Sequence, residues 1–191
     1  ADRISKEVGI AFSFINIGGG FGVPYKPGEA DLDVESVAKM VTDKFKAKFG
    51  NNGPRLLIEP GRYIVCDAGI LLAKVHHIKR AGKVIVGTDA GMNTLLRPAI
   101  YGSYHHMSVA NKLNEERKET VTVVGQVCEN TDHLARDREL PIVSEGDIIA
   151  VLNAGAYGFA MSSQYNSRPR CAEVMVNASQ SDVTREREGF E

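Results

Sequence analysis

The sequence of 191 residues contains no tryptophan, only three cysteines and no long apolar segment. Cys66, Cys128 and Cys171 are an odd number without CxxC spacing, which argues against a disulfide framework and against a thiolate metal site. No apolar run approaches the roughly 20 residues that a membrane-spanning helix needs. We therefore expect no membrane partner, and the few cysteines favour a reducing, cytoplasmic location.

Neither sign of charge is in excess, because the sequence contains 23 Lys and Arg and 24 Asp and Glu, which gives a formal net charge of -1. Nucleic-acid-binding domains usually show a basic excess, so we expect no nucleic-acid partner. The histidines include two adjacent pairs, His76-His77 and His105-His106. On a strand the rings of such a pair point to opposite faces and cannot share a metal ion, so we expect no metal site.

The first third of the chain alternates short apolar runs with a helical pattern. The runs are AFSFINI (11–17) and RLLIEPG (55–61), and residues 33–50 between them place apolar side chains at helical spacing. A strand-helix-strand unit of this kind implies parallel strands with a helix packed on them. The chain opens on the charged, helix-like stretch ADRISKEVGI without a methionine, and we expect it to be a piece of a longer protein.

After about residue 70 the pattern changes to strand-like runs separated by Gly, Asn, Asp and Pro. These runs are ILLAKVHHIK, KVIVGTD, GSYHHMSVA, ETVTVVGQVC, DIIAVL and AEVMVN. Their spacing is typical of an antiparallel sandwich or barrel. We expect a boundary within residues 66–72, dividing the chain into domains 1–68 and 69–191, and a frayed charged tail, SDVTREREGFE.

Two motifs lie at the ends of the predicted parallel strands, where such folds place ligands. Gly18, Gly19 and Gly20 follow the first strand and fit either a phosphate cradle or a tight structural turn. They match neither G-x-G-x-x-G nor the Walker form. Glu59 and Arg62 follow the second strand, where they fit either the binding of a charged ligand or a surface ion pair.

Three motifs lie in the predicted β domain. DAGMNTLLRPAIYGSYH carries Arg97 and Tyr101, for which the alternative is a short helix with an exposed arginine. LNAGAYGFAM places Tyr157 in a Gly/Ala-rich turn, where its ring could serve for packing alone. GQVCENTD pairs Cys128 with Glu129; a lone cysteine is more often a buried, inert residue than a reactive thiol.

Five segments in this order resemble the C-terminal half of the diaminopimelate decarboxylase family, pyridoxal-phosphate enzymes with an alanine-racemase-like barrel. The resemblance covers about residues 10–178 and rests on NIGGGFG, EPGR, DAGMNTLLRPAIYGSYHH, GQVCENTD and GAYGFAMSSQYNSRPRCAEV. It implies that residues 1–68 are the last strands and helices of a (β/α)8 barrel. Residues 69–191 would then form an all-β antiparallel Greek-key barrel or sandwich.

The resemblance also implies a cofactor site for pyridoxal 5'-phosphate. In this reading Glu59 faces the pyridine nitrogen and keeps it protonated. The remaining cofactor residues surround the phosphate: Gly18, Gly19, Gly20, Gly61, Arg62 and Tyr157.

The implied substrate is meso-2,6-diaminopimelate, which loses one carboxylate to give L-lysine. Arg97 and Tyr101 would hold its distal carboxylate, Glu129 its distal ammonium, and Arg62 and Tyr157 would also contact it. Cys128 would return a proton to the alpha carbon. Two carboxylates and two ammoniums require basic and acidic partners of this kind.

Two further consequences follow from the resemblance. The family forms homodimers with shared active sites, in which the cysteine-glutamate pair of one subunit reaches the cofactor of the other. The family's cofactor lysine has no counterpart among residues 1–191, since Lys74, Lys79 and Lys83 fall outside its motif, so we expect this piece alone to be inactive. An ornithine or arginine decarboxylase of the same fold and a non-catalytic homologue remain as alternatives, although RPAIY and CENTD favour the diacid.

Overall fold

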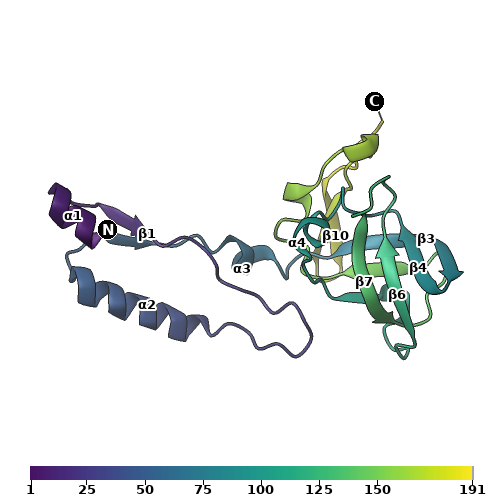
Figure 1. The fold of residues 1–191 in the computed structure, drawn as a ribbon, viewed down its shortest axis with the longest axis horizontal. Helices are drawn as coiled ribbons and strands as arrows, with labels where there is room; N and C mark the ends of the chain where they lie inside the picture. Colours follow the sequence, from purple (N-terminus) through teal and green to yellow (C-terminus); the bar gives the residue numbers. More distant parts are fainter. Residues whose placement is uncertain (191) are drawn as a thin grey trace. The chain divides into compact units, whose positions relative to one another are not determined.

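The computed structural model describes residues 1–190, which form two compact units (Figure 1). The first unit comprises Ala1–Pro24 and Gly28–Ile64, and the second comprises Tyr25–Pro27 together with the chain from Val65 onwards. We describe each unit separately. The predicted identity of residues 1–68 as part of a (β/α)8 barrel, and of residues 69–191 as the β domain, stays a prediction.

The first unit is a strand-helix-strand arrangement preceded by the short helix α1 (Asp2–Val8). β1 (Phe14–Asn16) pairs with β2 (Arg55–Leu57), and the pairing is parallel, as the sequence pattern predicts. Between them runs α2 (Val34–Phe49), whose N-cap Asp33 accepts a 3.0 Å hydrogen bond from the N–H of Ser36. The helix ends at Gly50, and α3 (Gly61–Val65) follows β2.

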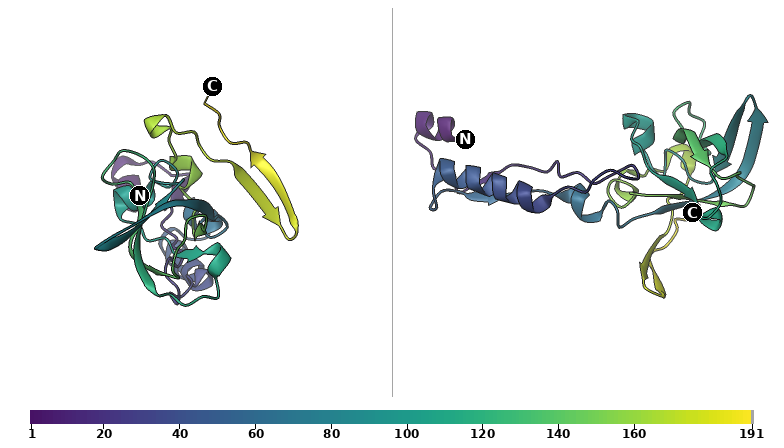
Figure 2. Two further views of the ribbon diagram at one scale, coloured as in Figure 1. Left: turned by 90° about the vertical axis from the view of Figure 1, so that its right-hand side faces the viewer. Right: turned by 90° about the horizontal axis from the view of Figure 1, so that it is seen from below.

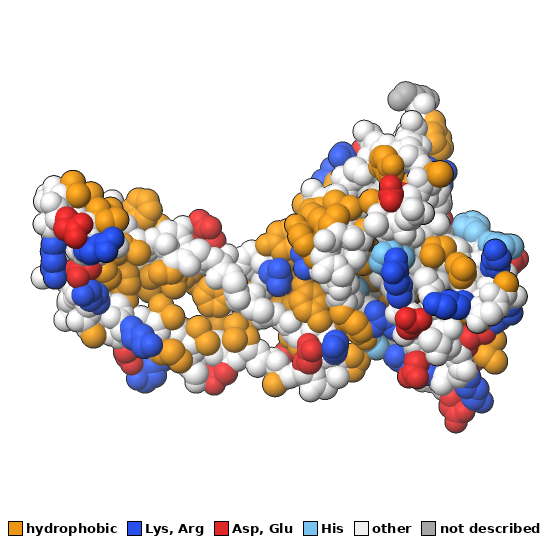
Figure 3. Space-filling model, in the orientation of Figure 1, with side chains coloured by type: hydrophobic (Ala, Val, Ile, Leu, Met, Phe, Trp, Pro, Cys, Tyr) orange, Lys and Arg blue, Asp and Glu red, His pale blue; other side chains and the backbone are white. Residues whose placement is uncertain are grey.

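The apolar side chains of the first unit remain largely exposed. Of the described residues 1–24 and 28–64, none is buried, although strands and helices here carry apolar residues. Examples are Ile4, Phe14, Met40 and Leu57, and Figure 3 shows apolar side chains gathered over this unit. A two-stranded sheet with its helices buries too little apolar surface for an independent core.

The second unit contains a six-stranded sheet in the order β5-β8-β3-β4-β6-β7. All neighbouring strands are antiparallel except β4 and β6, which are parallel, so the predicted all-antiparallel sheet is wrong at this pair. The reason is the long connection from β4 to β6, which returns the chain to the end where β4 began. The strand bounds are β3 (Leu71–Ala81), β4 (Lys83–Thr88), β5 (Met107–Val109), β6 (Glu119–Val124), β7 (His133–Leu140) and β8 (Ile148–Val151).

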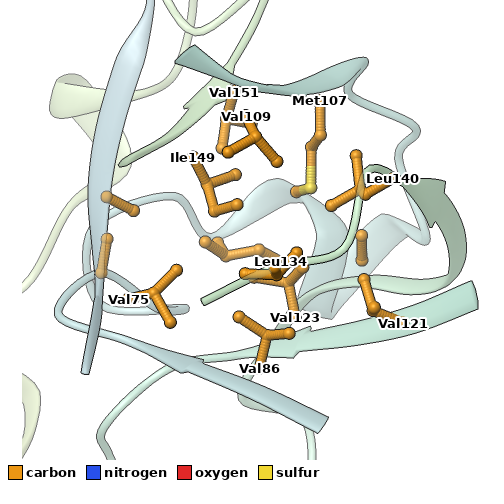
Figure 4. Packing of buried hydrophobic residues seen from close by; sticks show 14 of the residues in the cluster. Val75, Val86, Met107, Val109, Val121, Val123, Leu134, Leu140, Ile149 and Val151 are labelled. Carbon is orange, nitrogen blue, oxygen red and sulfur yellow. The ribbon is translucent and has the colours of Figure 1, made fainter. Parts of the chain in front are cut away.

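The two outer strands, β5 and β7, contact each other, so the mixed sheet nearly closes into a barrel. Its interior is filled by branched apolar side chains from every strand (Figure 4). β6 illustrates the alternation of side chains along a strand, because Val121 and Val123 are buried in the interior while the residues next to them are not. The Greek-key connectivity stays a prediction.

Two strands were not expected from the sequence. β7 has the polar sequence HLARDREL, in which only the inward positions are apolar. β10 (Gln180–Arg185) pairs antiparallel with β9 (Glu173–Asn177), so the expectation of a frayed tail is wrong for residues 181–185. This hairpin projects from its unit, as both views of Figure 2 show. The second unit also contains α4 (Arg97–Tyr101) and three short 3-10 helices, η1 (Ala110–Lys112), η2 (Phe159–Met161) and η3 (Tyr165–Ser167).

Candidate functional site

In the first unit the loops that follow β1 and β2 lie against each other. The N–H of Glu59 donates a 2.8 Å hydrogen bond to the carbonyl of Gly18. A Cβ on Gly19 would approach the Glu59 carbonyl oxygen to 2.5 Å, so a larger residue at position 19 would push the loops apart. Gly18 and Gly20 have φ angles of 77° and 90°, in the left-handed region that glycine adopts without strain.

Asn16, the last residue of β1, connects these two loops. Its Nδ2 donates to Oε1 of Glu59 at 2.6 Å, and its Oδ1 accepts from the N–H of Gly18 at 2.8 Å. The Glu59 carboxylate is therefore held in place beside the glycines. The sequence reasoning did not single out Asn16, although a polar residue ending an apolar strand was the available signal.

Gly61 and Arg62 begin α3 directly after this loop. The N–H of Gly61 donates to the Glu59 carbonyl at 2.9 Å, which fixes the turn between Glu59 and the helix. Arg62 is half-buried. The structure thus brings the predicted residues Gly18, Gly19, Gly20, Glu59 and Gly61 together in the first unit.

In the second unit Arg97 is buried, with 8% of its surface exposed, so the alternative of an exposed arginine is wrong. Its guanidinium carbon lies 5.7 Å from the ring centroid of Tyr101 and 5.3 Å from that of Tyr157. Nη2 donates to Oγ of Ser103 at 3.3 Å, whereas the buried Nε has no hydrogen-bond partner among the described residues. A guanidinium placed in this way has donors available for a planar anion such as a carboxylate.

A tight turn presents Tyr157 to Arg97. Tyr157 has a φ of 61°, and the turn is anchored by hydrogen bonds from Ala154 N–H to Gly69 O at 2.8 Å and from Gly155 N–H to Cys66 O at 3.0 Å. A Cβ on Gly155 would overlap the backbone carbonyl of Val65. Glycine at this position is thus required by the close approach of two backbone segments.

His105 lies close to Arg97 and is fully buried. Burial lowers the pKa of His105; the hydrogen bond to the carbonyl of Leu152 raises it, and the positive charges of Arg97 and Arg138 lower it again. The net effect is a lowered pKa, so the imidazole is neutral at neutral pH. Its Nδ1 lies 2.9 Å from Leu152 O and therefore carries the proton.

Cys128 is exposed at the loop of residues 125–132, which joins β6 to β7. This excludes the interpretation of Cys128 as a buried core residue. Of the other two cysteines, Cys66 is buried and Cys171 is partly buried, and burial raises the pKa of the Cys171 thiol. Cys128 is thus the most exposed of the three thiols.

Glu129 lines a cavity of about 550 Å³ in the second unit. The carboxylate is exposed, and its Oε1 accepts a 3.3 Å hydrogen bond from the N–H of Thr131. The other lining residues are Met92, Asn93, Thr131, Ser163 and Tyr165. Asn93 is buried, and within the described chain its Oδ1 has no hydrogen-bond partner. The sequence reasoning missed these other lining residues, because tertiary structure alone brings them to one wall.

The described residues were also compared with the requirements of a membrane-spanning helix and of a metal site. Across residues 1–190, no helix has the length and apolar character needed to cross a membrane. No cluster of three or more His, Cys, Asp or Glu side chains suited to a metal ion occurs among these described residues.

Comparison with known proteins identifies the family. Residues 30–155, more than half of the chain, match the model described as pyridoxal-dependent decarboxylase, C-terminal sheet domain. The chain belongs to this family. It is 52% identical over its full length to a diaminopimelate decarboxylase from Methanothermobacter thermautotrophicus, of which it covers 45%. The chain thus spans about half the length of the curated relatives that it matches.

Solved structures of this family have the same fold as the chain. A diaminopimelate decarboxylase from M. jannaschii is 39% identical with a TM-score of 0.87, over 99% of this chain and 44% of the other. A diaminopimelate decarboxylase from Helicobacter pylori, complexed with L-lysine, is 34% identical with a TM-score of 0.85, over 99% of this chain and 45% of the other.

Proposed function

We propose that the complete protein decarboxylates meso-2,6-diaminopimelate to L-lysine with pyridoxal 5'-phosphate as cofactor. The observation that carries this proposal is the buried guanidinium of Arg97 near the rings of Tyr101 and Tyr157, with a buried Nε that has no hydrogen-bond partner in the described chain. A buried cation with open donors favours an anionic group, and the distal carboxylate of a diamino diacid supplies one. Relatives named diaminopimelate decarboxylase support the same substrate.

The first-unit loops fit the proposed cofactor. Gly18, Gly19 and Gly20 allow backbone to approach a phosphate closely, as phosphate sites at strand ends require. Asn16 holds the Glu59 carboxylate, which we assign to the pyridine nitrogen. When bound, the cofactor would supply an electron sink for the pair left at the alpha carbon as CO2 departs. Gly61, Arg62 and Tyr157 would complete the phosphate contacts.

In the second unit we assign Cys128 and Glu129 to the substrate. The Sγ of Cys128 donates a proton to the alpha carbon after decarboxylation, and its exposure at a loop supports this role. Glu129 binds the distal ammonium from the wall of the cavity. We further propose that the protein is a cytoplasmic homodimer, with this pair reaching the cofactor site of the partner subunit.

Rejection of smaller substrates follows from Arg97. Ornithine lacks the distal carboxylate, so its binding would leave a buried guanidinium unpaired, which typically lowers kcat/KM by several orders of magnitude. The decisive assay offers the complete protein meso-diaminopimelate, ornithine and arginine, and measures CO2 release. Turnover of ornithine or arginine alone would overturn the diacid assignment, and turnover of none would favour a non-catalytic homologue.

The role of Cys128 is tested by Cys128→Ala in the complete protein. We expect kcat to fall by about 100-fold or more, because loss of a general acid has effects of this size. Binding of the cofactor, followed by its absorbance, should be unchanged. Cys171→Ala is the matched control, since it removes a partly buried thiol of the same unit. An unchanged kcat in Cys128→Ala would remove the proton-donor role.

A further inference from the structure

Asp132 closes the loop that carries Cys128 and Glu129, and its carboxylate is buried with 6% of the residue exposed. Oδ1 accepts a 2.7 Å hydrogen bond from the N–H of Met92, and Oδ2 accepts a 2.8 Å hydrogen bond from the N–H of Val127. One carboxylate therefore joins two segments of the chain. Val127 directly precedes Cys128, and Met92 lies in the segment that leads to Arg97.

Two glycines form the space that the Asp132 carboxylate occupies. A Cβ on Gly91 or on Gly125 would collide with Oδ1 of Asp132. A Cβ on Gly91 would also come within 2.7 Å of the Cα of Gly125, so the two backbones pass in close contact around the carboxylate. Backbone hydrogen bonds complete the arrangement, from Gly125 N–H to Asp132 O at 3.2 Å and from Asp132 N–H to Glu129 O at 3.1 Å.

The side chains of Cys128 and Glu129 are both exposed, so packing against neighbouring side chains does little to fix their positions. Their positions must instead be set by the backbone to which they are attached. Charge-assisted hydrogen bonds from backbone N–H groups to a buried carboxylate are about twice as strong as neutral ones. Asp132 supplies two such bonds at the base of the loop, one of them to the residue that precedes the thiol.

We infer that Asp132 is a positioning residue for the Cys128–Glu129 pair. Its carboxylate holds the backbone of the pair against the Gly91–Met92 segment and thereby sets where the thiol and the carboxylate of the pair lie. Asp132 touches neither substrate nor cofactor in this scheme and acts through the loop. The effect on turnover rests on the proposed function of Cys128, whereas the effect on the loop itself does not.

The test is Asp132→Asn in the complete protein. The amide keeps one acceptor oxygen but turns an N–H group toward one of the two backbone donors, so one of the two bonds is lost. The matched control is Asp147→Asn, because Asp147 is equally buried and its carboxylate also accepts a backbone N–H, that of Ser144 at 2.8 Å, in a different turn. We expect kcat to fall by about 100-fold in Asp132→Asn, as for a catalytic group displaced by about 1 Å, and to stay within about twofold in the control.

A second measurement is independent of activity. Iodoacetamide alkylation of Cys128, followed by peptide mass analysis, reports the state of the loop, and the less accessible Cys66 and Cys171 serve as internal references. We expect the Cys128 rate to change by about fivefold or more in Asp132→Asn and not in Asp147→Asn. Equal rates and equal kcat in the two variants would overturn the positioning role.

A third measurement needs no variant. The N–H groups of Met92 and Val127 should exchange with deuterium as slowly as those of β6, because both are bonded to a buried carboxylate. Rapid exchange of both would overturn the inference, even if Asp132→Asn did not fold. Full kcat in Cys128→Ala would instead contradict the proposed function, and alkylation and exchange would still decide the role of Asp132.

Discussion

Replacement of Asp147 by Asn should destabilise the second unit by an amount that the structure allows us to estimate. The Asp147 carboxylate accepts hydrogen bonds from Lys112 Nζ at 2.7 Å, Asn111 Nδ2 at 2.7 Å and Ser144 N–H at 2.8 Å. Losing one partner of a buried charge pair typically lowers the free energy of unfolding by about 3 to 5 kcal/mol. Lys112 keeps a 2.9 Å hydrogen bond to the carbonyl of Ile142, so we expect a smaller loss of about 2 to 3 kcal/mol.

The same variant should show a defined pH dependence. Burial raises the pKa of Asp147, but the hydrogen bonds from Lys112, Asn111 and Ser144 and the charge of Lys112 together lower it below its ordinary value of 3.8. A group with a lowered pKa in the folded state contributes stability that is fully present above its unfolded pKa. This contribution is lost as the pH falls through the folded pKa. The difference between the unaltered protein and Asp147→Asn should therefore shrink below about pH 4.

Urea unfolding at about pH 7 and at about pH 3.5 measures both effects. We expect the midpoint of the second unit to fall by about 1 M at neutral pH, with a smaller difference in acid. Glu145→Gln is the control, since it removes one negative charge from an exposed position in the same turn. An unchanged midpoint at neutral pH, or a difference that persists undiminished in acid, would refute the reasoning.

Three further variants test the core and the two site regions. Leu134→Ala should lower the free energy of unfolding by about 2 to 5 kcal/mol, because the side chain is fully buried in the barrel interior, while Leu113→Ala at an exposed position should not. Gly19→Ala should weaken binding of pyridoxal 5'-phosphate at least about tenfold in a fluorescence titration, because its Cβ would press on the Glu59 carbonyl. Arg97→Lys should raise KM for meso-diaminopimelate by about tenfold or more in steady-state assays, because an ammonium lacks the two-point geometry of a guanidinium. Unchanged binding in Gly19→Ala, or an unchanged KM in Arg97→Lys, would contradict the corresponding assignment.

Much of the first unit follows from local pattern. Apolar runs that end at glycine or proline predicted β1 and β2, and apolar spacing with Asp33 and Gly50 at the ends predicted α2. These signals involve residues close together in the chain, so they are visible in one segment at a time. The parallel pairing followed because two strands joined through a helix must run in the same direction.

The second unit shows where local pattern was insufficient. The parallel pair β4–β6 depends on how a long connection crosses the sheet, which no single segment encodes. β7 was missed because its sequence is mostly polar, and only its partner β6 and the core explain why Leu134 and Leu140 face inwards. β10 was missed for a similar reason, since its sequence is mostly polar and it pairs with β9.

The stretch GQVCENTD shows the same contrast between what the sequence predicts and what the tertiary structure decides. Its letters, in order with the other four segments, identified the family and singled out Cys128 and Glu129 as candidates. The burial of Arg97, the exposure of Cys128 and the bonds of Asp132 to Met92 and Val127 emerged only when the chain was folded. Chain order is a property of covalent neighbours. Exposure and hydrogen bonding depend instead on segments that are distant in the sequence, such as Met92 and Asp132, which lie 40 residues apart. Residue types and their order thus determine which chemistry is available, and tertiary contacts determine which of those groups can reach a ligand and what holds them in place.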